Sequence, residues 1–115
     1  MKAIRGAITI SNNVESEIVK QTEYLFQELV KRNHLKEESI VSVICSCTKD
    51  ITAAYPGIAI RNLGFNVPVL CVQEQFVEGS LPLCIRILIH TISPSNPSHV
   101  YVGKARSLRP DLCEE

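Results

Sequence analysis

Hydrophobic and polar residues alternate over residues 2–10, KAIRGAITI, and the polar run SNN ends the alternation. A period of two predicts a β-strand with one buried face. The next apolar residues recur at helical spacing up to about residue 33, which predicts an amphipathic helix that covers a sheet. Asn12, with Glu15 three residues later, has the spacing of a helix capping box. The apolar stripe of this helix consists of Val14, Ile18, Val19, Leu25, Phe26, Leu29 and Val30.

The rest of the chain is dominated by short apolar runs that predict strands over residues 39–48, 67–76, 83–92 and 99–104. The long helix gives the first two strands a right-handed β-α-β connection. Tyr55 precedes Pro56, so a short helix is expected to begin at the proline and to end near Gly64. We expect a loop over residues 93–98, and a mobile tail over 111–115 after Pro110.

These elements predict one mixed α/β (α+β) domain over residues 1–115, with a five-stranded mixed sheet, one long helix and one short helix. One long helix and a fragment cannot cover both faces of such a sheet. The uncovered face would still carry apolar runs such as SIVSVIC and CIRILI. We therefore expect self-association into a homo-oligomer.

Two of the apolar runs, residues 67–76 and 83–92, each carry one charge in the middle, Glu74 and Arg86. If the runs pair as a hairpin that is symmetric about Ser80, the two charges lie opposite one another. They then form either a structural ion pair on a half-exposed sheet face or a polar site in which Arg86 binds an anion. Arg5, Arg61 and Arg109 add further guanidinium groups, and several converging arginines favour a small metabolite with more than one negative charge.

The composition excludes several classes of function. Twelve basic and twelve acidic residues give a formal net charge of zero without a basic tract, which argues against nucleic acid as a partner. No segment is long enough to span a bilayer, so we expect no membrane association. Five cysteines without a C-x-x-C pair argue against a disulfide framework and a zinc site, and they favour a reducing, cytoplasmic compartment. No cofactor-binding fingerprint or metal-ligand cluster occurs.

The spacing of Cys71 and Glu74 adds a constraint. Residues three apart on a regular strand point to opposite faces. If both line one pocket, either a bulge separates them or they belong to two copies of the site in an oligomer.

Five motifs, in order along nearly the whole chain, resemble the monofunctional chorismate mutases of the Bacillus (AroH) class. They are IRGA at residues 4–7, YP with A-x-R at 55–61, CVQE at 71–74, CIR at 84–86, and HVY with LRPDL at 99–112. The resemblance implies a homotrimeric pseudo-α/β-barrel with sites at subunit interfaces. It also implies the rearrangement of chorismate to prephenate, for phenylalanine and tyrosine biosynthesis, without cofactor or metal.

The resemblance also implies roles for individual residues. Arg86 would meet the ether oxygen of the substrate, Arg5 would anchor a carboxylate, and Glu74 would accept the ring hydroxyl and orient Arg86. The substrate pocket would be completed by Leu70, Cys71, Val72, Gln73 and Tyr101, with Tyr55 and Arg61 from the neighbouring subunit. The sequence departs from the family pattern at Ile58, where a basic residue is expected, and at Leu70, where a threonine is expected.

Two other functions are compatible with the sequence. The same trimeric scaffold could bind a metabolite without converting it. A small hydrolase or deaminase could use Cys71 as its nucleophile, although Cys71 has no basic neighbour in the sequence.

Overall fold

The structure is a computed structural model that describes residues 1–92 and 96–112. The elements are β1 (Lys2–Thr9), α1 (Glu15–Arg32), β2 (Ile40–Cys47), α2 (Ile58–Asn62), β3 (Val69–Gln73), β4 (Cys84–Thr91) and β5 (Val100–Val102), with short 3-10 segments η1 (Glu37–Ser39), η2 (Gly103–Leu108) and η3 (Pro110–Leu112). The predicted loop over 93–98 and the predicted tail over 111–115 lie partly outside the described residues.

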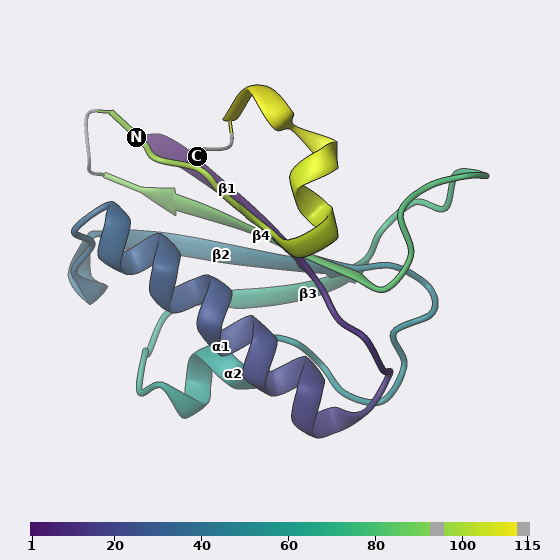
Figure 1. Cartoon of the computed structure of the whole chain (residues 1–115). Coiled ribbons are helices and arrows are strands. Elements are labelled where there is room, and N and C mark those ends of the chain that lie inside the picture. The colour runs from purple at the N-terminus through teal and green to yellow at the C-terminus, as the bar shows by residue number, and fades with distance from the viewer. Residues whose placement is uncertain (93–95, 113–115) are drawn as a thin grey trace.

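The five strands form one mixed sheet in the order β3-β2-β4-β1-β5. Strand β4 is antiparallel to both of its neighbours, β1 and β2, whereas β3 and β5 run parallel to the strands beside them. Figure 1 shows α1 lying across one face of this sheet, with α2 next to it. The predicted fold class, a five-stranded mixed sheet with one long and one short helix, is confirmed.

The predicted hairpin of residues 67–76 with 83–92 is wrong, because β2 lies between β3 and β4. The burial of the strands accounts for the observed order. Every residue of β4 is at least partly buried, as suits a strand with a neighbour on each side, whereas three of the five residues of β3 are exposed, as suits an edge.

The predicted capping box is also wrong. Val14 occupies the N-cap of α1 without a side-chain cap, and it is Glu17 that accepts hydrogen bonds from the backbone amides of Ser11 and Asn12. The neighbouring residue, Asn13, binds the loop between β2 and α2. Its Oδ1 accepts from the amides of Thr52 and Ala53 at 3.0 and 3.1 Å.

The hydrophobic core lies between α1 and the sheet. Buried residues of the helix, Ile18, Leu25, Phe26 and Leu29, pack on the helix-facing side chains of the central strands, Ile4, Ile8, Val43, Ile85, Ile87 and Ile89. Phe26 also meets Phe65 edge to face, with 5.0 Å between ring centroids. This core holds β1 and β4 in place, and the opposite face of these two strands carries Arg5 and Arg86.

Among the described residues, the other face of the sheet is covered at one end, where Ala105 of η2 packs against Ala7 and Cys84. Farther along this face Leu70 remains 60% exposed and Val72 39% exposed. We call this side the open face. Self-association across it stays a prediction.

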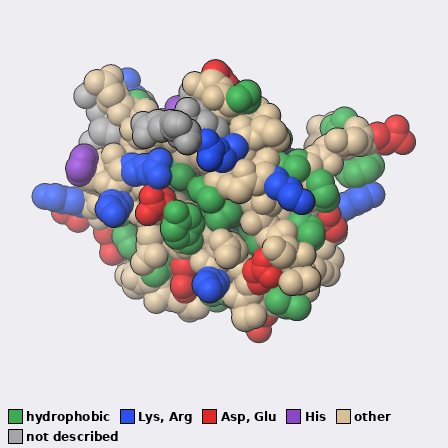
Figure 2. Space-filling view, in the orientation of Figure 1, with side chains coloured by type: hydrophobic (Ala, Val, Ile, Leu, Met, Phe, Trp, Pro, Cys, Tyr) green, Lys and Arg blue, Asp and Glu red, His purple; other side chains and the backbone are tan. Residues whose placement is uncertain are grey.

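The surface visible in Figure 2 carries basic and acidic side chains interspersed with apolar ones, without a large region of one charge. This distribution agrees with the balanced composition. Within the described residues, no helix is both long and apolar enough to cross a membrane.

Candidate active site

Glu74 and Arg86 form an ion pair on the open face, with 2.8 Å between Arg86 Nε and Glu74 Oε1. The predicted contact is confirmed, but β2 provides the geometry. Ser46 of β2 pairs with Arg86 on one side and with Val72 on the other, and the amide of Glu74 continues the ladder by donating to the carbonyl of Cys47. The carboxylate thus reaches across one strand to the guanidinium.

Ser46 completes this cluster, since its hydroxyl donates to Glu74 Oε1 at 3.3 Å. Arg86 Nε is itself buried, and its N–H is not aligned for a hydrogen bond with any described residue, so its contact with Glu74 is electrostatic. The Arg86 side chain as a whole is 43% exposed. The guanidinium is held at one nitrogen by a carboxylate while much of the side chain still reaches solvent.

Arg5 and Tyr101 lie on the same face as Arg86. Arg5 is paired with Leu88, and Tyr101 lies beside Ala7, the residue that pairs with Arg86. The three side chains line a shallow hollow of about 240 Å³. Two arginines therefore line one hollow, and arginine is suited to bind the carboxylates of an anion.

His99 binds the backbone of Arg5, and the sequence alone did not assign it to the site. The backbone amide of Arg5 donates to His99 Nδ1 at 3.0 Å, so this ring nitrogen carries no proton. Burial lowers the pKa of His99, and the charges of Arg5 and Arg109 lower it further. A neutral imidazole therefore adds no third positive charge. Arg109 itself is paired with Asp111, with 2.9 Å between Nη2 and Oδ2.

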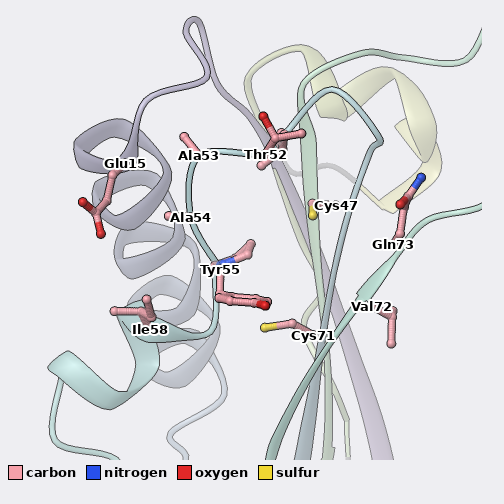
Figure 3. Close-up of a pocket in the computed structure, with 12 residues that line it drawn as sticks. Glu15, Cys47, Thr52, Ala53, Ala54, Tyr55, Ile58, Cys71, Val72 and Gln73 are labelled. Carbon is pink, nitrogen blue, oxygen red and sulfur yellow. The ribbon is translucent and has the colours of Figure 1, made fainter.

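Cys71 points to the opposite side of the sheet from Glu74, as the spacing of the two residues predicts for a regular strand. It lines a cavity of about 580 Å³ on the helix side. Figure 3 shows its thiol directed toward Tyr55, with Gln73 on the same strand and Val72 turned away. In one chain, the structure brings neither Cys71 nor Tyr55 to the hollow of Arg86.

The thiols of Cys45 and Cys71 interact directly across β2 and β3. The pKa of Cys71 is lowered because Cys45 and the amide of Gly57 hydrogen-bond to its sulfur. The pKa of the deeply buried Cys45 is raised by the same contact and by burial. Cys71 is therefore the more acidic of the two thiols.

Arg61 lies on α2 and is exposed at a third hollow, of about 380 Å³, which Gly57 and Phe65 also line. The predicted site residues thus fall into two groups in one chain. The open face carries Arg5, Leu70, Val72, Glu74, Arg86 and Tyr101, whereas Tyr55, Arg61, Cys71 and Gln73 lie around α2 and on the helix side of the edge strand β3.

Comparison with known proteins identifies the family of the chain. The family model described as chorismate mutase type I matches residues 1–112. The chorismate mutase AroH of Bacillus subtilis (strain 168) is 40% identical over 118 residues, which cover 97% of this chain and 92% of the relative. The AroH of Thermus thermophilus is 38% identical over 117 residues, covering 97% and 96% of the two chains.

A solved structure is similar as well. A chorismate mutase from Clostridium thermocellum is 40% identical and superposes with a TM-score of 0.91, covering 93% of this chain and 99% of that one. The match extends over nearly the full length in sequence and in structure. The chain therefore belongs to the chorismate mutase type I family.

Proposed function

We propose that this protein is a chorismate mutase, an isomerase that converts chorismate to prephenate in the biosynthesis of phenylalanine and tyrosine. The observation that carries the proposal is the hollow on the open face, where Arg5 and Arg86 meet Tyr101 beside the carboxylate of Glu74. Chorismate carries two carboxylates, a ring hydroxyl and an ether oxygen. Arg5 and Arg86 at the hollow offer cations for the carboxylates, and Glu74, which is paired with Arg86, offers a hydrogen-bond acceptor for the ring hydroxyl.

The reaction is an intramolecular rearrangement, so the protein needs to hold the reactive conformer and to stabilise charge as it develops. Negative charge grows on the ether oxygen while its bond to carbon breaks. We assign the donor at that oxygen to the guanidinium of Arg86, which Glu74 orients from its Nε side. Glu74 also accepts the ring hydroxyl, and Arg5 binds a carboxylate.

The separation of the predicted residues into two groups supports a homotrimer with interfacial sites. Strand β3 has an unpaired edge, and the exposed Leu70 and Val72 lie on it. A neighbouring copy that packs against this edge and the open face would bury them. It would also bring its own Tyr55 and Arg61 to the hollow, and the backbone of residues 70–73 would line the interface. The cytoplasmic location stays a prediction.

A hydrolase or deaminase that uses Cys71 is less well supported. The groups that lower the pKa of this thiol are Cys45 and the amide of Gly57, neither of which is a general base. No observation favours a binding module without catalysis.

The test is the loss of chorismate absorbance on addition of purified protein, with formation of prephenate measured in parallel. Arg86→Ala is expected to lower kcat/KM by about a hundredfold or more, since it removes a preorganised donor to the developing charge. Arg86→Lys keeps the positive charge but lacks the planar guanidinium, so its kcat/KM should lie between those of wild type and Arg86→Ala.

Arg32→Ala is the matched control, because Arg32 pairs with Glu28 on the exposed side of α1 and should leave the rate unchanged. Circular dichroism and sedimentation would establish that each variant is folded and has the same oligomeric state. Wild-type protein without any acceleration, or a fully active Arg86→Ala variant, would overturn the proposal.

A further inference from the structure

Three cysteines gather on the helix-facing side of the sheet, between two neighbouring strands. Cys45 and Cys47 lie on β2, and Cys71 lies on β3. All three are free thiols. Cys71 and Cys47 line the 580 Å³ cavity, whereas Cys45 is completely buried behind them.

Cys45 and Cys71 are direct partners in the parallel register of β2 and β3. Neighbouring strands lie about 4.8 Å apart, which falls within the range of roughly 4.4–6.8 Å between the Cα atoms of bridged cysteines. The two thiols also influence each other electrostatically, since the proximity of Cys45 lowers the pKa of Cys71 and that of Cys71 raises the pKa of Cys45. Cys47 instead is in register with Gln73, so it is diagonal to Cys71.

The surroundings keep the thiol of Cys71 accessible. Gly57 faces it closely, since a Cβ atom at position 57 would lie 2.8 Å from the sulfur. The missing side chain therefore leaves room for the thiol. A small molecule that enters the cavity beside Tyr55 reaches Cys71 before it can reach Cys45 (Figure 3).

We infer that Cys45 and Cys71 form an oxidisable dithiol site, in which Cys71 reacts with hydrogen peroxide and Cys45 resolves the product as a disulfide. The sulfur of Cys71 attacks one peroxide oxygen, the O–O bond breaks, and a sulfenic acid and water form. The sulfur of Cys45 then attacks the sulfenic sulfur, and a second water leaves as the S–S bond forms. The two thiols supply both electrons that reduce the peroxide.

The disulfide would draw the sulfur of Cys71 away from the cavity and toward the core. Because residues 70–73 are proposed to line the substrate site, oxidation is expected to lower mutase activity, a consequence that rests on the proposed function. The spacing of adjacent parallel strands is near the short end of the disulfide range, so the bond is expected to be strained and readily reduced. Activity would return with a dithiol reductant.

The experiment treats the folded protein with hydrogen peroxide, alkylates the remaining thiols, and maps the cross-linked peptides by mass spectrometry. We expect a Cys45–Cys71 peptide that disappears after treatment with dithiothreitol. Cys71→Ser and Cys45→Ala should abolish it. Alanine is chosen at position 45 because the site is apolar and a polar replacement could prevent folding. Cys47→Ser and Cys84→Ala are the matched controls and should still form the bond; alanine is again chosen at position 84 because that site is buried and apolar.

A Cys47–Cys71 disulfide, irreversible oxidation of Cys71 without pairing, or no reaction at Cys71 in the folded protein would overturn the inference. The two proposals fail in different ways. Reduced protein without mutase activity that still forms the Cys45–Cys71 bond would refute only the proposed function. Reduced protein with activity that never forms the bond would refute only the dithiol site.

Discussion

Gly6 of β1 packs closely against α1 and β5, and its replacement by alanine tests how the sheet is held against the helix. An added Cβ atom would lie 2.9 Å from Leu29 Cδ1, 3.1 Å from Leu25 Cδ1 and 3.0 Å from the carbonyl oxygen of Val100. Both leucines are completely buried, and the oxygen belongs to the backbone of β5. An added methyl group would therefore require the leucine side chains and the backbone of β5 to shift.

The magnitude follows from two opposing terms. Overpacking a close-packed core costs about 1–3 kcal/mol, since side chains leave their rotamers or strands shift. Removing a glycine stabilises by about 0.4–1 kcal/mol through the unfolded chain. The expected net result for Gly6→Ala is a destabilisation of about 1–2 kcal/mol. Each kcal/mol lowers the Tm of a domain near this size by about 4–8 °C.

The assay is urea unfolding at a fixed protein concentration, since association would couple stability to concentration. Gly6→Ala is compared with wild type, and the pair is repeated in a Leu29→Ala background, where the closest contact is absent. The cost of Gly6→Ala should be smaller in that background. A Gly6→Ala protein as stable as wild type, or an equal cost in both backgrounds, would refute the packing argument.

Two further predictions concern polar groups near the arginines. Ser46→Ala removes the hydroxyl that donates to Glu74. It should lower kcat/KM about five- to tenfold, which corresponds to roughly 1–1.4 kcal/mol. An unchanged kcat/KM would show that Glu74 keeps its position without this hydrogen bond. The pKa of His99 is lowered in the folded state. As the pH falls below about 6.5, this histidine is therefore protonated more in the unfolded chain than in the folded one. The free energy of unfolding should decrease as the pH falls below that value. The free energy of unfolding of His99→Gln should depend less on pH there than that of wild type, and parallel curves for the two proteins would contradict the assignment.

Local patterns were sufficient to predict the elements, since alternation and helical spacing reflect burial on one face, which each segment carries in its own sequence. They could not predict the order of the strands. The hairpin expected for Glu74 and Arg86 assumed that successive runs pair, whereas β2 lies between them. The ion pair is nevertheless present, because a long carboxylate side chain just beyond the end of β3 reaches across Ser46.

Other parts of the site depend on contacts between residues far apart in the chain. Asn13 binds the amides of Thr52 and Ala53, and His99 accepts from the amide of Arg5. Such hydrogen bonds leave no periodic signal in either segment. The arginines could be identified because a charge within an apolar run is visible locally, whereas the groups that position them become visible only once the sheet is assembled.

The central place of β4 has a consequence for protein synthesis. Strands β1 and β2 each pair with β4, yet β4 is translated after both of them and after the edge strand β3. A nascent chain that ends before residue 84 therefore holds two strands whose common neighbour has not been made. Their unpaired edges are open to other chains until β4 leaves the ribosome, and pairing over such sequence distances is slow.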